Sequence, residues 1–166
     1  KPRIVDGGTG SGIIAISLAS AWPSANITAL DISWPALKVA QQNARLHNQV
    51  GIQFLQANLL NALEANFDMI CANLPYIPSN TFKKLLVSRW EPHLALDGGQ
   101  DGMVYIWELL QQAKTRLASP SVLLLEIEAS QGRACLAACQ HHFPQANCCL
   151  HQDLGGHDRL IEIQAG

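Results

Sequence analysis

The 166-residue chain lacks the features that mark several classes of protein. Charged residues make up only 14% of it and the formal net charge is −2, which argues against a protein that holds nucleic acid through bulk electrostatics. No apolar run approaches the length of a membrane-spanning helix, and no signal-peptide pattern opens the sequence. The five cysteines lack the spacing of a secreted disulfide framework, so we expect a cytoplasmic protein without membrane association.

The cysteines do not form a convincing metal site either. Cys135 and Cys139 are four residues apart in a helical pattern, so both are expected to face the core. Cys148 and Cys149 are neighbours in an expected strand, where their side chains point to opposite faces and cannot both ligate one ion without a bend. We therefore assign no metal ligands.

Hydrophobic residues make up 48% of the chain, which suits one globular domain spanning residues 1–166. Apolar runs alternate with helical patterns. The expected strands are residues 4–5, 26–31, 52–56, 67–72, 122–127, 147–151 and 159–163. The expected helices are residues 11–21, a segment capped by Ser33, and residues 103–117 and 131–142. This alternation predicts an α/β fold, a mostly parallel seven-stranded sheet with helices on both faces.

The sequence also predicts the direction of the last strand and the place where a ligand binds. Gly155 and Gly156 form a short turn between the last two strands, which indicates a hairpin and an antiparallel last strand. In mostly parallel sheets, ligands bind beyond the carboxyl ends of the strands. The residues that carry chemistry should therefore follow the first four strands.

A glycine-rich loop, Asp6 to Gly12, follows the first strand. Glycines allow a tight turn and close approach of a ligand, and the next helix directs its free N–H groups to the same place. One residue separates each pair among Gly8, Gly10 and Gly12, whereas the dinucleotide fingerprint needs two between its second and third glycines. The loop resembles motif I of class I methyltransferases, which implies S-adenosylmethionine as cofactor. An ordinary strand-to-helix turn is the alternative.

The second and third strands are each followed by polar residues. Asp31 can accept hydrogen bonds from both hydroxyls of a ribose, or it can simply be an acid favoured at a helix N-terminus. Asn58 can hydrogen-bond an adenine edge while Leu59 packs on the ring, although a capped loop explains these residues equally well. We include Ile32, beside Asp31, among the candidate cofactor-binding residues.

The fourth strand is followed by Asn73-Leu74-Pro75-Tyr76. This tetrapeptide resembles the Asn-Pro-Pro-Tyr signature of methyltransferases that modify nitrogen in a planar, conjugated group. Such a nitrogen is a poor nucleophile because its lone pair is delocalised, and acceptors on its N–H groups orient it for attack. The Asn73 side-chain oxygen and the Leu74 carbonyl are the candidate acceptors, because Pro75 holds Leu74 extended. Tyr76 would stack on the target group.

Longer segments make the resemblance more specific. The stretch from Arg89 to Gly102, then Leu124 to Ile127 with Gln131-Gly132, and finally Asp153 to Arg159 are similar to the HemK/PrmC family. That family methylates the amide nitrogen of the glutamine in the Gly-Gly-Gln motif of peptide chain release factors, and a close relative acts on a ribosomal protein. The resemblance implies the same reaction here, with a release factor or ribosomal protein as partner.

Carried over to this sequence, the resemblance yields two sets of residues. The expected cofactor-binding residues are Asp6, Gly8, Thr9, Gly10, Ser11, Gly12, Asp31, Ile32, Asn58, Leu59 and Asn73. The expected substrate-binding residues are Asn73, Leu74, Pro75 and Tyr76, of which Asn73 and Tyr76 are the expected catalytic residues.

The chain departs from the family pattern in three respects. Leu74 replaces the first proline of the signature, which should loosen the loop, and Gly7 replaces a usual leucine beside the cofactor. The resemblance begins at the family's first strand, so its N-terminal helical domain is absent from this sequence. The chain is then a fragment, or a variant with different substrate recognition.

Two other functions remain open. The first is an amino methyltransferase acting on adenine or cytosine in nucleic acid, which shares the tetrapeptide but would need a basic track that this sequence does not show. The second is a cofactor-binding module without activity. Lys83, Lys84 and Arg89 could touch a phosphate or an acidic partner, although a solvated loop explains them more simply.

Overall fold

The structure is a computed structural model that describes residues 1–82 and 96–166. Within these residues, seven strands form one sheet in the order β3-β2-β1-β4-β5-β7-β6. The strands are β1 (Arg3–Gly7), β2 (Asn26–Asp31), β3 (Gln53–Gln56), β4 (Phe67–Asn73), β5 (Leu117–Glu126), β6 (Asn147–Gln152) and β7 (Asp158–Ala165). The helices are α1 (Ile13–Ala21), α2 (Trp34–Leu46), α3 (Ser79–Phe82), α5 (Val104–Ala113), the 3₁₀ turn η2 (Ala129–Gln131) and α6 (Gly132–His142).

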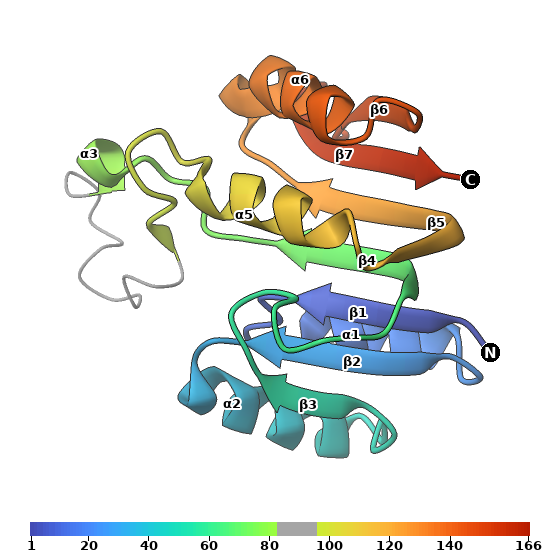
Figure 1. Cartoon of the computed structure of the whole chain (residues 1–166). Coiled ribbons are helices and arrows are strands. Elements are labelled where there is room, and N and C mark those ends of the chain that lie inside the picture. The colour runs from blue at the N-terminus through green and yellow to red at the C-terminus, as the bar shows by residue number, and fades with distance from the viewer. Residues whose placement is uncertain (83–95) are drawn as a thin grey trace.

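The direction of the strands confirms the predicted topology. Strands β1 to β5 pair in parallel, whereas β7 is antiparallel to both β5 and β6. In Figure 1 the arrowheads of β1, β4 and β5 therefore point to one edge of the sheet, and that of β7 points to the other. Chain order reverses between β1 and β4, which places a topological switch point beside the loop that follows β1.

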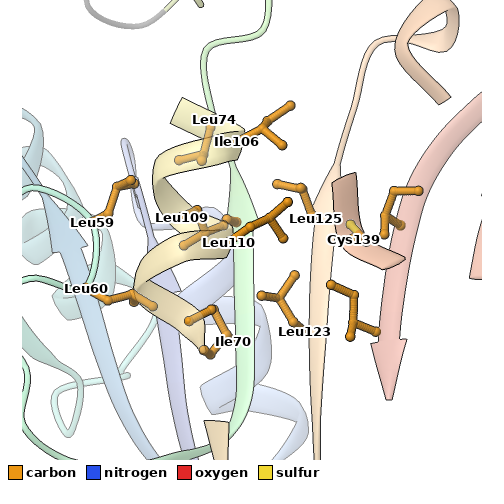
Figure 2. Packing of buried hydrophobic residues seen from close by; sticks show 14 of the residues in the cluster. Leu59, Leu60, Ile70, Leu74, Ile106, Leu109, Leu110, Leu123, Leu125 and Cys139 are labelled. Atoms are coloured by element: carbon orange, nitrogen blue, oxygen red, sulfur yellow. The ribbon is translucent and has the colours of Figure 1, made fainter. Parts of the chain in front are cut away.

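Helices cover both faces of the sheet. One buried cluster joins α1 and α2 to the sheet through Ala15, Ile16 and Ala44. A larger cluster joins α5 and α6 to the opposite face, and Figure 2 shows Leu109 and Leu110 of α5 beside the side chains of the central strands. In β5 the cover is one-sided: Leu123 and Leu125 are fully buried in the larger cluster, whereas Val122 and Leu124, which point to the other face, are only partly buried.

The expected helix over residues 103–117 was too long. Helix α5 ends at Ala113, and Leu117 already pairs with Phe67 as the first residue of β5. The strand runs to Glu126, whereas the expected strand began at Val122. Ser119 and Pro120 interrupt the local apolar pattern, but the strand continues past them, because Leu117 pairs with Phe67 and, after an irregularity in the register, Val122 pairs with Met69. Pairing with a distant strand thus overrides the local signal.

The cysteines of α6 face the core, as expected from their spacing. Cys135 and Cys139 are both fully buried, and burial raises the pKa of each thiol to about 12. No group of three or more metal-ligating side chains comes together among residues 1–82 and 96–166. Within the same residues, no helix is both long and apolar enough to cross a membrane.

Candidate active site

A cavity of about 600 Å³ opens at the carboxyl ends of β1, β2 and β4. Its volume is in the range of sites for small molecules and cofactors. Its walls come from the glycine loop, the turns after β2, β3 and β4, and the end of β5. The lining residues are Gly8, Thr9, Gly10, Ser11, Ile13, Ile14, Asp31, Ile32, Ser33, Ala36, Ala57, Asn58, Leu59, Asn73, Leu74, Pro75, Tyr76, Ile77, Leu96, Tyr105 and Glu126.

The glycine loop is tied to the end of β2 by two backbone donors. The Thr9 N–H donates to the Leu30 carbonyl at 2.7 Å, and the Gly10 N–H donates to Asp31 Oδ2 at 2.8 Å. Helix α1 then begins at Ile13 without a side-chain cap. Ile13 and Ile14, the first residues of this helix, line the cavity, and the positive end of the helix dipole there favours a negative ligand group.

Asp6 lies beneath this loop and not in the cavity. Its side chain is 0% exposed, and its Oδ2 accepts hydrogen bonds from the Thr9 hydroxyl at 2.6 Å and the Ala15 N–H at 3.2 Å. Its Oδ1 has no partner among the described residues. Burial raises the pKa of Asp6 from 3.8 to about 6, and the charge of Asp31 adds to this, while the two hydrogen bonds oppose it. The Asp6 carboxyl thus stabilises the glycine loop through its hydrogen bonds to Thr9 and Ala15.

Asp31 presents its carboxylate to the cavity, as the sequence predicts. Oδ2 accepts the Gly10 N–H and Oδ1 accepts the Ser33 N–H, both at 2.8 Å. Each carboxylate oxygen can accept a further hydrogen bond. The two backbone donors fix the carboxylate in place, and its remaining acceptor capacity is available to a ligand with two neighbouring hydroxyls.

Asn58 is oriented by a carboxylate on α5. Its Nδ2 donates to Glu108 Oε1 at 2.7 Å, and Gln112 donates to the same oxygen at 3.1 Å. Because a carboxylate only accepts, the Asn58 amide nitrogen must face Glu108, which leaves its oxygen as the group available to the cavity. Leu59 lines the cavity and also belongs to the core cluster beside α5 (Figure 2). The turn thus combines a hydrogen-bond acceptor with an apolar wall.

Asn73, the last residue of β4, is oriented in the same way. Its Nδ2 donates to Glu126 Oε2 at 2.9 Å, across the pairing of β4 with β5. The Asn73 Oδ1 and the Leu74 carbonyl accept no hydrogen bond from the described residues. Two oxygens on consecutive residues are therefore available as acceptors at this edge of the cavity.

Leu74 departs from the expectation in one respect. Its side chain is only 3% exposed and packs in the core beside α5 (Figure 2), where a proline could not reach. It also lies against the glycine loop, because a Cβ added at Gly8 would be 2.9 Å from Leu74 Cδ2. The side chain thus anchors the tetrapeptide, and the loosening expected from the loss of a proline stays a prediction.

The backbone of Tyr76 is held by two other segments. Gln131, which is buried, donates from Nε2 to the Tyr76 carbonyl at 2.9 Å and to the Asp101 carbonyl at 3.4 Å. Gly102 has φ +75°, and a Cβ there would overlap the Tyr76 carbonyl oxygen. The Gly98 N–H also donates to the Ile77 carbonyl at 2.8 Å. The glycines of this region thus permit close packing against the tetrapeptide.

Most of the expected site residues meet at the cavity. Asp6 and Gly12 are the exceptions: Asp6 is buried under the loop, and Gly12 is the N-cap of α1. Gly7, at the end of β1, does not line the cavity either. The lining residues that the sequence did not single out for the site are Ile13, Ile14, Ser33, Ala36, Ala57, Ile77, Leu96, Tyr105 and Glu126. The charged residues Lys83, Lys84 and Arg89, and the first part of the stretch from Arg89 to Gly102, residues 89–95, fall outside the described residues.

Glu126 is the most informative of the residues that were missed. In the sequence it stands only as part of the apolar segment, Leu124 to Ile127, that is similar to the HemK/PrmC family. It lies 53 positions from Asn73 in the chain, so no local pattern connects the two. The available signal was that each is the polar residue ending one of two apolar strands, which become neighbours in the sheet.

The fold and the cavity together define the class of protein. This strand order, with an antiparallel β7 and a glycine loop after β1, is the class I methyltransferase fold. A ribosomal protein L11 methylase from Lactobacillus delbrueckii subsp. bulgaricus shares it with a TM-score of 0.72 and 22% identity, over 100% of this chain and 72% of the other. A 16S rRNA N2 G1207 methyltransferase from Thermus thermophilus, solved with AdoMet and guanosine, has a TM-score of 0.68 and 16% identity, over 99% of this chain and 38% of the other.

Comparison of sequences identifies the family more specifically than comparison of structures does. Residues 1–90 match the family model described as "Methyltransferase small domain", and the chain belongs to this family. A release factor glutamine methyltransferase of Lactococcus lactis subsp. lactis is 37% identical over 164 residues, which cover 98% of this chain and 60% of that protein. The chain thus spans little more than half the length of this relative.

Proposed function

We propose that this domain transfers a methyl group from S-adenosylmethionine to the side-chain amide nitrogen of a glutamine in a protein. The observation that carries this proposal is the pair of acceptors at the end of β4. Asn73 Oδ1 and the Leu74 carbonyl have no partner among the described residues, and Glu126 fixes the Asn73 amide with its nitrogen turned away. A primary amide has two N–H groups that such a pair can accept.

The cavity fits S-adenosylmethionine in its donor and acceptor groups. Asp31 supplies a fixed carboxylate for the ribose hydroxyls, while Asn58 supplies an acceptor and Leu59 an apolar wall for the adenine. The amides at the start of α1 suit the negative end of the methionine part. Glu126 adds a negative charge to the wall of a site for a positively charged sulfonium. When bound, the cofactor supplies an electrophilic methyl group.

The residues of the tetrapeptide contribute to the reaction by positioning the amide that is to be methylated. An amide nitrogen is weakly nucleophilic because its lone pair is shared with the carbonyl. Accepting its two N–H groups at Asn73 Oδ1 and the Leu74 carbonyl holds the nitrogen in place and favours the build-up of positive charge on it. Asn73 does not titrate near neutrality, so the proton released afterwards passes to water. Tyr76 lines the cavity and can stack on the planar amide.

The proposal that the methyl acceptor is a protein rests on the described activity of similar proteins. The Lactococcus lactis protein is described as a release factor glutamine methyltransferase, and a protein of the same description from Bradyrhizobium diazoefficiens is 43% identical over 137 residues. We therefore propose the glutamine of the Gly-Gly-Gln motif in a release factor as the acceptor, with a ribosomal protein glutamine as the second candidate. This substrate would place the protein in the cytosol, with residues 1–166 acting as its catalytic domain.

Parallel labelling tests this proposal. Purified protein and methyl-labelled S-adenosylmethionine are incubated separately with a release factor, a ribosomal protein fraction and duplex DNA, with Asn73→Ala as the control enzyme. Label in the release factor, absent with the control, supports the proposal, and label in the ribosomal fraction alone favours the second acceptor. Label only in DNA would contradict a protein substrate. Cofactor binding by calorimetry without label in any acceptor would indicate an inactive binding module.

A further inference from the structure

Glu126 and Asn73 form a pair at the ends of two neighbouring strands. They are Cα partners in the parallel pairing of β4 with β5, and both line the cavity. The Asn73 Nδ2 donates to Glu126 Oε2 at 2.9 Å. Because the pairing register of two central strands brings them together, their contact is built into the sheet and does not depend on a loop.

The chemistry of the pair decides which way the Asn73 amide points. An ionised carboxylate has acceptors but no donor, so only the amide nitrogen of Asn73 can face it favourably. A hydrogen bond to a charged acceptor is about twice as strong as a neutral one. Without Glu126, the side-chain amide could rotate about its terminal bond and present its nitrogen to the cavity, because that torsion is broad and roughly two-fold.

The orientation of Asn73 matters for catalysis because the glutamine amide that accepts the methyl group offers N–H groups to it. If Asn73 turned its nitrogen into the cavity, donor would face donor, and the amide that is to be methylated would lose one of its two positioning contacts. From this geometry we infer that Glu126 is a positioning residue for methyl transfer, acting through Asn73 by keeping Oδ1 turned to the acceptor. The inference rests on the proposed function, because it assumes that Asn73 Oδ1 receives an N–H group.

A matched set of variants separates this role from others. Glu126→Ala removes the carboxylate that accepts the Asn73 hydrogen bond, whereas Glu126→Gln keeps an oxygen that can still accept from Asn73. Glu64→Ala removes an exposed carboxylate away from the cavity and controls for the loss of charge. Steady-state rates are measured with the acceptor that the unmodified protein labels, and cofactor affinity is measured by calorimetry.

The expected results are specific to positioning. Glu126→Ala should lower kcat by about 10²-fold, as a misplaced contact in a reacting pair does, with cofactor Kd changed no more than a few-fold. Glu126→Gln should recover most of the rate, and Glu64→Ala should match the unmodified protein. In the Asn73→Ala background, adding Glu126→Ala should lower the rate no further. A full kcat in Glu126→Ala, or two losses that multiply in the double variant, would overturn the inference.

A second measurement needs no acceptor, so it distinguishes failure of this inference from failure of the proposed function. In the ¹⁵N-labelled protein, the side-chain amide protons of Asn73, assigned by their loss in Asn73→Ala, should exchange with water more slowly than those of asparagines whose side-chain nitrogen makes no hydrogen bond. Glu126→Met, which keeps the length of the side chain but has no acceptor oxygen, should speed this exchange and serves if Glu126→Ala does not fold. Unchanged exchange in Glu126→Met would contradict the inference even if no methyl acceptor is found.

Discussion

Replacing Asp6 with asparagine should change how the stability of the domain depends on pH. The folded state holds the Asp6 carboxyl fully buried, and burial raises its pKa from 3.8 to about 6. Between these two values the folded chain keeps a proton that the unfolded chain releases. The stability linked to this proton is therefore present at low pH and is lost as the pH rises through about 6.

The size of the effect follows from the pKa shift. A rise of roughly two units corresponds to about 3 kcal/mol, of which about 2.5 kcal/mol falls between pH 4 and pH 8, because part of the change lies below pH 4. Asparagine is neutral at every pH and keeps an oxygen that can accept from Thr9 and Ala15. Any constant cost of its buried amide nitrogen cancels when the two pH values are compared.

Urea unfolding at intervals from pH 4 to pH 8 measures the effect. The difference in unfolding free energy between Asp6→Asn and the unmodified protein should shift toward the variant by about 2.5 kcal/mol as the pH rises. Glu64→Gln, which removes an exposed carboxylate, is the matched control and should leave a flat difference. A flat difference for Asp6→Asn as well would refute the assignment of a proton to the carboxyl beneath the loop.

Three further substitutions test separate parts of the site. Asn73→Ala should lower kcat by about 10²–10³-fold with cofactor affinity within a few-fold, and retention of full activity would exclude its role as acceptor. Asp31→Ala should weaken cofactor binding by about 1–3 kcal/mol in calorimetry, because it removes the proposed ribose contact and an anchor of the glycine loop. Gly102→Ala should lower the unfolding free energy by about 1–3 kcal/mol and raise the acceptor KM, since its Cβ would displace the Tyr76 carbonyl; an unchanged KM would show that this contact is not needed.

The central part of the fold could be predicted because its signals are local. The strand over residues 26–31 has the bounds expected from its Ile and Thr content, and Ser33 caps α2 by accepting from the Ala36 N–H at 3.3 Å. The hairpin at Gly155 and Gly156 likewise fixed the direction of β7. The start of β5 could not be predicted, because Leu117 joins the strand through its pairing with Phe67 of β4.

At the site, too, the residues with a local sequence signal could be predicted, and those that depend on contacts between distant segments could not. Asp31, Asn58 and Asn73 were predicted because each directly follows or ends a strand at the expected edge. The pattern could not show that Asp6 turns under the loop, since burial depends on how α1 packs above it. Nor could it reveal Glu126, which meets Asn73 only through the register of two strands.

The acceptor site at Asn73 can be tested most directly by locating the methyl group on its product. A release factor incubated with the domain and S-adenosylmethionine is digested and sequenced by tandem mass spectrometry. The account predicts a mass increase of one methyl group on the glutamine of the Gly-Gly-Gln motif, lost with Asn73→Ala. A methyl group found on another residue, on a nucleobase, or unaffected by Asn73→Ala would contradict it.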